Sequence, residues 1–175
     1  MANLRTTRLT LAPCSPQDQP DFVALEQDPE VMLFLNGGQP VDRGVTDPDA
    51  HFPVPVGIEP HVWTARHPDG AFVGWFCLWP QGDGSAELGY RLRRATWGQG
   101  LAFEGAKMLV DWGFASAGYA RITASTMAVN LASRRVMEKI GMTHMRTDFP
   151  DFADPIPGAE QGEVWYQITF DKTLP

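Results

Sequence analysis

The sequence predicts an α+β fold in which helices flank one mixed β-sheet. Three observations predict it. Short runs of alternating apolar residues are typical of strands, and two longer runs, 101–117 and 130–140, have helical periodicity. Turns rich in glycine and proline separate these runs. The inferred order is strand, helices, a three-strand meander, helix, strand, helix and two strands, which is typical of a mixed sheet with helices packed around it.

In the first third of the chain, residues 4–12 alternate weakly and predict a first strand. Ser15-Pro16 predicts a helix start, with serine as the N-cap and proline in the first helical position. Pro29 breaks or restarts this helix, and Gly37-Gly38 ends it. Residues 37–60 hold five prolines and little periodicity. A loop of this length is either a lid or binding loop, or a tolerated surface insertion.

The rest of the chain predicts the remaining sheet and two helices. A Pro68-Asp69-Gly70 turn has the chemistry of a hairpin between residues 61–67 and 72–79. The other predicted elements are a meander strand at 86–93, a helix at 101–117 ended by Gly118, a strand at 121–126, a helix capped by Asn130 over 130–140, and strands at 143–149 and 164–170.

Composition limits the kind of protein. A chain of 175 residues with 43% apolar residues predicts one domain, residues 1–175, with a substantial core. The longest apolar runs are too short for a membrane span, and the first residues lack a signal pattern, so a cytoplasmic protein is expected. The formal charge of −7 disfavours nucleic-acid binding. The spacing of cysteines and histidines predicts neither a disulfide framework nor a metal site.

The most informative segment is Trp97-Gly98-Gln99-Gly100-Leu101-Ala102, which joins a predicted strand to a predicted helix. Glycines in such a turn let backbone N–H groups approach an anion, and the helix dipole favours negative charge there. The segment therefore predicts a site for a phosphate-bearing ligand. Glycines also simply make turns, so the flanking motifs must support this interpretation.

Three motifs in order carry a resemblance to a known family. They are Glu87-Leu88-Gly89-Tyr90, the 97–102 turn followed by Glu104-Gly105, and the segment from Asn130 to Met142. In this order they resemble the GNAT N-acetyltransferases, and in particular the RimJ/RimL-like branch that acetylates ribosomal-protein N-termini. The resemblance implies a mostly antiparallel sheet of about six to seven strands, about four helices, and acetyl-CoA as the donor.

The resemblance also implies which residues bind acetyl-CoA. The turn holds the pyrophosphate through the backbone of residues 97–102. Strand main-chain groups near Tyr90, Arg91 and Leu92 meet the pantetheine arm and the oxyanion, because neighbouring strands splay there in this family. Arg93, Arg94 and Arg134 are candidates for phosphate contacts, with a solvated charged rim as the alternative.

Glu87 is the candidate catalytic carboxylate. On an alternating strand it shares a face with Gly89, Arg91 and Arg93. The resemblance implies that it faces the acceptor and takes the amine proton, through water. An exposed strand carboxylate paired with an arginine is the alternative, because a carboxylate is a weak base unless its surroundings raise its pKa. Gly89 fits either close approach of a ligand or a simple strand irregularity.

Asn130 and Ser133 lie three residues apart at the start of a predicted helix, on one side of it. The resemblance implies that Asn130 touches pantetheine and that Ser133 protonates or solvates the leaving thiolate. Asparagine is also an excellent N-cap, and serine is ordinary in a first turn. Many relatives use a tyrosine of this helix as the acid, but this helix has none, so solvent is an alternative proton source.

Other candidate groups favour structural roles. Cys77 lies between Trp75 and Trp79 in an apolar strand, which is typical of a small buried hydrophobe and not of a nucleophile. His61 and His144 are alternative bases, but each also fits a strand end or the surface. The tryptophans of the hairpin, Trp63 among them, favour the core over an aromatic cage.

The predicted function is therefore acetyl transfer from acetyl-CoA to a primary amine by direct attack, the acceptor being a peptide or protein N-terminus or a small amine. The alternatives are a non-catalytic acyl-CoA-binding or sensing module on the same fold, and a site for a different phosphate ligand. A homodimer is compatible with the sequence. The first helix pair, residues 37–60 and residues 148–162 are expected to form the acceptor wall, where Asp148, Asp151 and Asp154 either attract a cationic acceptor or solubilise a loop.

Overall fold

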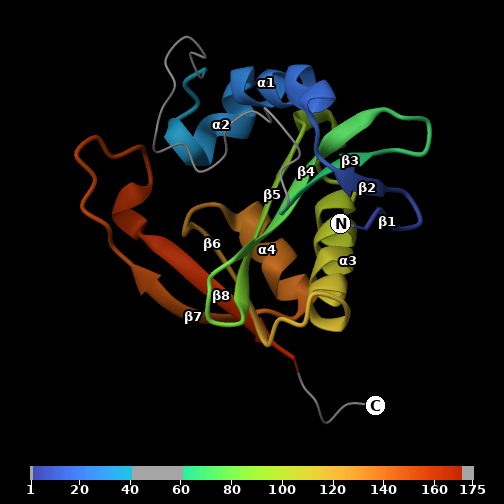
Figure 1. The fold of residues 1–175 in the computed structure, drawn as a ribbon. Helices are drawn as coiled ribbons and strands as arrows, with labels where there is room; N and C mark the ends of the chain where they lie inside the picture. Colours follow the sequence, from blue (N-terminus) through green and yellow to red (C-terminus); the bar gives the residue numbers. More distant parts are fainter. Residues whose placement is uncertain (1, 41–60, 171–175) are drawn as a thin grey trace.

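The computed structural model describes residues 2–40 and 61–170. Their strands form one eight-stranded sheet in the order β1-β2-β3-β4-β5-β6-β8-β7, antiparallel throughout except for the parallel pair β5–β6 (Figure 1). The strands are β1 (Leu4–Arg5), β2 (Thr10–Pro13), β3 (Val62–Arg66), β4 (Phe72–Pro80), β5 (Ser85–Leu92), β6 (Arg121–Met127), β7 (Thr143–Asp148) and β8 (Glu163–Thr169). The helices are α1 (Gln19–Gln27), α2 (Pro29–Asn36), α3 (Leu101–Ala115) and α4 (Leu131–Ile140), with 3₁₀ turns at Pro16–Asp18, Arg94–Thr96 and Ala159–Gln161.

This architecture confirms the predicted α+β fold, with one correction. The single strand predicted at 4–12 is a hairpin of two strands, which brings the number of strands to eight. The chain turns where the Thr6 N–H group donates to the Leu9 carbonyl at 2.9 Å. The Glu104 carboxylate of α3 accepts from the Thr6 hydroxyl and from the Arg8 N–H group, at 2.5 and 2.8 Å. Local bonds between Thr6 and Leu9 and a contact with a distant helix together stabilise a turn in a segment whose sequence alternates.

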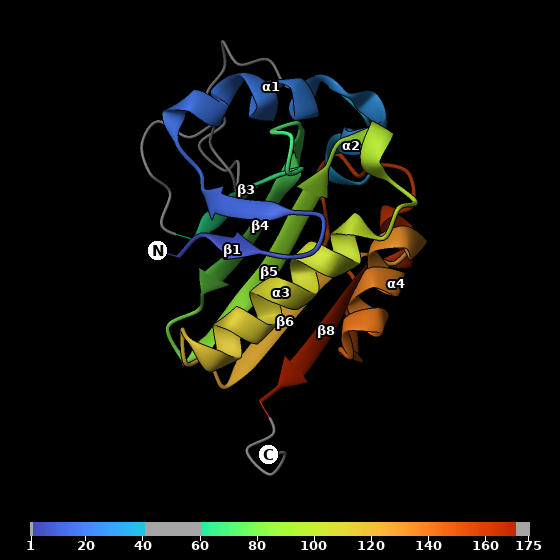
Figure 2. The same cartoon turned by 90° about the vertical axis from the view of Figure 1, so that its right-hand side faces the viewer.

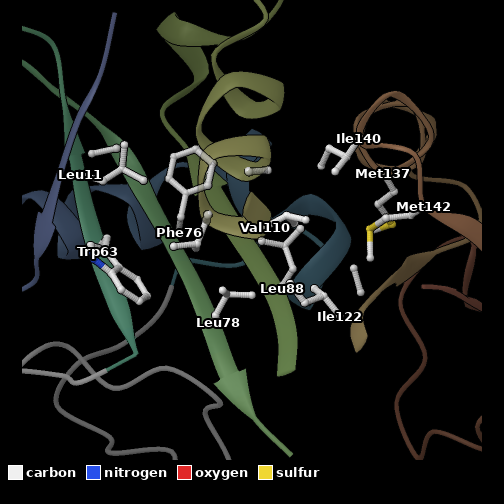
Figure 3. Packing of buried hydrophobic residues seen from close by; sticks show 14 of the residues in the cluster. Leu11, Trp63, Phe76, Leu78, Leu88, Val110, Ile122, Met137, Ile140 and Met142 are labelled. Carbon is white, nitrogen blue, oxygen red and sulfur yellow. The ribbon is translucent and has the colours of Figure 1, made fainter. Parts of the chain in front are cut away.

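The two faces of the sheet carry different helices. On one face α3 and α4 cover the larger core cluster, which includes Phe76, Leu88 and Ile122 (Figure 3). On the other face Phe22 of α1 packs against Phe72 and Trp75 of β4, with ring centroids 6.0 and 6.5 Å apart. Figures 1 and 2 show α1 and α2 together at one end of the sheet, away from the long axis of α3.

Two glycines let α3 lie close to the sheet. A Cβ atom at Gly105 would lie 2.3 Å from Phe76 Cζ, and one at Gly113 would lie 2.9 Å from Leu78 Cδ1. Figure 3 shows the Phe76 ring directed from the sheet toward this helix. The helix ends at Ala115, two residues before the predicted end, and Gly118 adopts its left-handed conformation (φ 76°) beyond the cap at Ser116.

The other predicted helix ends agree with the structure. Asp28 caps α2 by accepting from the N–H groups of Glu30 and Val31, and Gly37 closes α2 with φ 75°. The segment after Ser15 starts as a 3₁₀ turn before α1. The predicted loop at 37–60 lies outside the described residues from residue 41 on.

The hairpin tryptophans are core residues, as predicted, but they serve different faces. Trp63 is fully buried against Trp112 on the α3 side, whereas Trp75 packs on the α1 side. Trp79 is the exception, with 37% of its surface exposed. None of the helices within residues 2–40 and 61–170 has the length and apolar character needed to cross a bilayer.

Candidate active site

The centre of the sheet is the point where β5 and β6 diverge. The two strands pair only at Ser85–Arg121, Ala86–Ile122 and Glu87–Thr123, although β5 continues to Leu92 and β6 to Met127 (Figure 1). Beyond Glu87, β5 has no strand partner on this side among the described residues, so main-chain groups on its edge are not used by the sheet. The splay expected between neighbouring strands near Tyr90 is therefore present.

The predicted glycine turn is exposed and its amides are available. Gly98 and Gly100 both adopt left-handed backbone conformations, with φ 73° and 79°, as the turn chemistry requires. A Cβ atom on Gly98 would meet nothing within 4 Å. In the part of the chain that the structure describes, no protein acceptor bonds the N–H groups of residues 98–103, the donors expected to meet a pyrophosphate.

An ion pair that no local sequence pattern indicates supports this turn. The Arg8 guanidinium contacts Glu104 Oε2 at 2.6 Å and donates through Nη1 to the Gln99 carbonyl at 2.9 Å. The Glu104 carboxylate is thereby directed to the N-terminal hairpin and not to the free amides of its own helix. Hydrogen bonds from Thr6 and Arg8 lower the pKa of Glu104, although its partial burial acts in the opposite direction.

The predicted arginines occupy different environments. Arg94 pairs with Glu30 of α2 and lies over the Trp97 ring, 5.2 Å from its centroid. Arg93 is exposed, and its guanidinium donates to the Phe72 carbonyl at 3.4 Å. Arg134 is turned into the molecule, where it donates to Tyr166 Oη at 3.2 Å and to a carbonyl of the β6–α4 connection at 2.9 Å.

The remaining turn residues divide between core and surface. The side chains of Leu92 and Leu101 are buried in the main core, so they are not available to a ligand. The Trp97 indole N–H donates to the Leu92 carbonyl at 2.8 Å, which joins the turn to the end of β5. Gln99 is exposed and donates to the Ala95 carbonyl at 3.0 Å, while Ala102 packs partly against the core.

The first turn of α4 brings two predicted residues together with a third. Asn130 Oδ1 caps the helix by accepting from the Ser133 N–H group at 3.2 Å. The Tyr90 hydroxyl of β5 lies 2.9 Å from Ser133 Oγ, so a tyrosine reaches this helix from the sheet. Burial raises the pKa of Tyr90 to about 12, although the hydrogen bond to Ser133 opposes the shift.

Glu87 occupies the last position at which β5 and β6 pair, on the face opposite α3. Its carboxylate is 3.4 Å from Ser125 Oγ of β6 and 3.4 Å from Gln81 Nε2. Both neighbours are hydrogen-bond donors, and the side chain is partly buried. The sequence pattern indicates Glu87 but not Ser125 or Gln81, because their proximity to Glu87 depends on how β4, β5 and β6 pair.

Along the same face, Arg91 contacts Glu26 of α1 at 3.5 Å and lies over the Trp75 ring. The Arg91 side chain therefore stabilises the attachment of α1 to the sheet. Gly89 leaves space for a protein neighbour, because a Cβ atom there would lie 2.8 Å from Cys77 Sγ. This contact gives Gly89 a structural reason for its identity.

The predicted acceptor wall is partly described. Residues 150–160 enclose a hollow of about 380 Å³, which no predicted donor-binding residue lines. Ile156 of this segment lies where a Cβ atom on Gly37 would meet it at 3.2 Å, so the segment reaches the end of α2. Asp148 is paired with Arg146, whereas Asp151 and Asp154 are exposed.

The rival groups pack against other parts of the protein. Cys77 is buried, and burial raises the pKa of its thiol to about 12, so it carries little thiolate at neutral pH. His144 packs on Tyr166, and His61 lies against Trp79. Among residues 2–40 and 61–170, no group of three His, Cys, Asp or Glu side chains is arranged to hold a metal ion.

Comparison with known proteins shows the family of this chain. Residues 8–143 match the family model described as an acetyltransferase (GNAT) domain. The chain belongs to the GNAT acetyltransferase family. Membership confirms the predicted enzyme class, an acyltransferase with acetyl-CoA as its donor. The chain is also 34% identical over 193 residues to the FsC-acetyl coenzyme A-N(2)-transacetylase of Aspergillus fumigatus, covering 98% of this chain and 77% of the relative.

Solved structures show the same fold at low sequence identity. One is the spermidine N-acetyltransferase from Vibrio cholerae in complex with CoA and spermine, with a TM-score of 0.74 and 16% identity, covering 94% of this chain and 96% of that one. Another is RimL, a ribosomal L7/L12 alpha-N-protein acetyltransferase, in complex with CoA, with a TM-score of 0.72 and 15% identity, covering 97% and 99%. These GNAT proteins differ in acceptor, so the fold by itself leaves the acceptor open.

Proposed function

We propose that this GNAT enzyme acetylates a primary α-amine by direct attack, with Glu87 as the group that takes the amine proton. The observation that carries the proposal is the position of Glu87 at the last paired rung before β5 and β6 diverge. The free amides of residues 98–103 lie beyond the far end of β5. One strand thus joins a carboxylate to an anion-binding turn.

In the proposed reaction the neutral amine forms a C–N bond with the thioester carbonyl carbon. The C–S bond breaks, and its electron pair leaves with the sulfur. Glu87, held by Ser125 and Gln81, takes the amine proton through water and passes it to solvent. Main-chain groups of β5 near Tyr90–Leu92 and the turn at 97–102 hold the donor, and Asn130, Ser133 and the exposed Arg93 complete the donor site.

The α-amine is favoured over a lysine-like amine by its acidity. An α-amine has a pKa of about 8, which leaves a useful neutral fraction at pH 7, whereas a lysine amine near 10.4 is almost fully charged. A carboxylate is a weak base and therefore suits an α-amine acceptor better than a lysine amine. The name of the Aspergillus fumigatus relative, a transfer to a nitrogen designated N(2), and the alpha-N-protein activity named for RimL support this class.

The same evidence supports placing the chain in the RimJ/RimL-like branch. The three sequence motifs lie in the expected order, and RimL has the same fold. The proposed α-amine acceptor is either a peptide N-terminus or a small amine derived from an amino acid.

The test is release of the CoA thiol with a panel of α-amines and ε-amines. We expect Glu87→Gln to lower kcat by about 100-fold, within the range of lost general-base catalysis, without changing the Kd for CoA measured by calorimetry. Asp111→Asn is the matched control, because it makes the same kind of carboxylate-to-amide change at an exposed ion pair on α3, and it should leave kcat unchanged. CoA binding by the wild-type protein with no thiol release for any amine would favour the non-catalytic acyl-CoA-binding module.

A further inference from the structure

A phenol from the sheet contacts the first turn of α4. Tyr90 Oη lies 2.9 Å from Ser133 Oγ and donates to the Ser133 carbonyl at 3.1 Å. The Tyr90 ring packs against Phe76, with ring centroids 6.2 Å apart. Two acceptors therefore lie within reach of one phenolic proton, and rotation about the C–O bond exchanges them.

Ser133 is also fixed from its other side. Its backbone N–H group donates to Asn130 Oδ1 at 3.2 Å, and Asn130 Nδ2 donates to Thr126 Oγ1 at 3.1 Å. Thr126 belongs to the part of β6 that has already diverged from β5. The serine hydroxyl thus lies beside the strand divergence, and Tyr90 is the one described residue whose side chain bonds it.

Acidity decides between two roles for the phenol. Burial raises the pKa of Tyr90 to about 12, whereas an alkyl thiol has a pKa of about 8.5. Passing a proton from Tyr90 through Ser133 to a thiolate is therefore unfavourable by about three powers of ten. A phenol that keeps its proton is instead a permanent hydrogen-bond donor.

We propose that Tyr90 is a positioning residue whose phenol donates to Ser133 Oγ and so directs the serine proton toward the leaving sulfur. The proposal rests on the proposed function. As the C–S bond breaks, the Ser133 hydroxyl donates a hydrogen bond to the developing thiolate but keeps its proton. The thiolate is then protonated by solvent. A hydroxyl that accepts one hydrogen bond is a stronger donor in the next, because the two bonds polarise each other.

The experiment measures the pKa of the CoA thiol in the complex of CoA with the protein. This measurement needs no acceptor amine. The thiolate absorbs in the ultraviolet, so a pH titration of the CoA complex gives the pKa of the bound thiol. We expect this pKa to lie below that of free CoA in the wild type. Tyr90→Phe and Ser133→Ala should each move the pKa back toward the free value.

Turnover gives a second readout. We expect Tyr90→Phe to lower kcat by about tenfold, a typical effect for one hydrogen bond, with the KM for acetyl-CoA unchanged. In Ser133→Ala the same tyrosine change should cost nothing further, since the two residues act as one unit. Tyr119→Phe is the matched control, because Tyr119 lies beyond the far end of α3, and it should leave both readouts unchanged.

Two results would overturn the proposal. One is an identical thiol pKa in the wild-type and Tyr90→Phe complexes. The other is a Tyr90→Phe effect on kcat that is equally large in the Ser133→Ala background. Such an effect would indicate that Tyr90 only stabilises the position of α4 and does not act on the sulfur through Ser133. If the wild type binds CoA but acetylates no amine, the proposed function fails, and the thiol titration still decides the role of Tyr90.

Discussion

The proposed donor side and the proposed acceptor side of this protein are built from different kinds of group. The donor side, residues 97–103 and 130–134, offers mainly backbone amides freed by glycine conformations and by strand divergence. The acceptor side, comprising α1, α2 and the Glu87 face of the sheet, is held by side-chain ion pairs between distant segments, such as Arg91–Glu26 and Arg66–Asp18. Backbone groups tolerate many side chains, whereas paired side chains specify one arrangement.

On the proposed acceptor side, charged groups hold the start of α1 against the sheet. Burial acts to raise the pKa of Asp18, but hydrogen bonds from Arg66, the Ser15 N–H group and Thr64 outweigh it and lower that pKa. The carboxylate therefore remains charged at neutral pH and anchors the start of α1 to β3. GNAT relatives with one fold and different acceptors are consistent with variation on this side.

Because the proposed donor side depends on backbone groups, we expect CoA affinity to be most sensitive to substitutions that displace the backbone. Gly105→Ala places a methyl group 2.3 Å from the Phe76 ring, so α3 must move away from the sheet. We expect a loss of about 2 kcal/mol in the free energy of unfolding by urea, typical of overpacking, and at least tenfold weaker CoA binding.

Gly113→Ala is its control on the same helix. The Cβ atom there meets flexible ends of Leu78 and Ile122 at 2.9 and 3.0 Å. The gain in helix propensity, up to about 1 kcal/mol, should offset this crowding. Equal losses in the two variants would contradict a specific contact between Gly105 and Phe76.

A smaller effect on stability and CoA affinity is expected from the Arg8–Glu104 pair, which contacts the turn through the Gln99 carbonyl. Glu104→Gln removes a charged acceptor of three groups, so we expect a loss of about 1–2 kcal/mol at pH 7. CoA affinity should fall by several-fold, measured by calorimetry. Lys107→Ala breaks an exposed pair on the same helix and should cost no more than about 0.5 kcal/mol.

The pH dependence of this pair has a defined sign. The pKa of Glu104 is lowered on folding, so its contribution is present above the ordinary value of 4.5 and is lost as pH falls through the lowered value. The stability difference between wild type and Glu104→Gln should therefore shrink in acid. A difference that stays constant from pH 7 to pH 3 would rule out a role for the charge.

The smallest effect is expected at Arg94, where the two sides meet. Arg94 pairs with Glu30, but both side chains are more than half exposed. Exposed pairs contribute about 0–1 kcal/mol, so Arg94→Ala should change the free energy of unfolding by about 0.5 kcal/mol or less. We expect CoA affinity to change by no more than about threefold, because the amides do the binding. A tenfold loss would show that side chains matter on the donor side as well.

The glycine turn and the helix cap on the proposed donor side could be predicted from the sequence because their signals are local. Gly98 and Gly100 indicate the turn within a segment of six residues. Asn130 indicates the helix cap, and the N–H group that it accepts from belongs to Ser133, three residues later. The single strand predicted at 4–12 was wrong because the chain turns between Thr6 and Leu9, where Glu104, nearly one hundred residues away, accepts from the Thr6 hydroxyl and the Arg8 N–H group. No local pattern contains such a contact.

The same limit explains the residues that were missed. Ser125 reaches Glu87 only through the β5–β6 register, and Arg8 reaches Gln99 only once the hairpin packs against α3. Arg134 belongs to a motif typical of phosphate contacts, yet its guanidinium bonds Tyr166. The inward turn of that side chain depends on β8, which follows α4 in the chain.

The bond between Thr6 and Glu104 spans 98 residues, so it sets an order of events during synthesis. The hairpin of β1 and β2 leaves the ribosome before α3, because it precedes α3 in the chain. Contacts of such long range form late, because the intervening chain must first be ordered. We expect the nascent chain to acquire affinity for CoA only after α3 has emerged and packed against the hairpin that was synthesised before it.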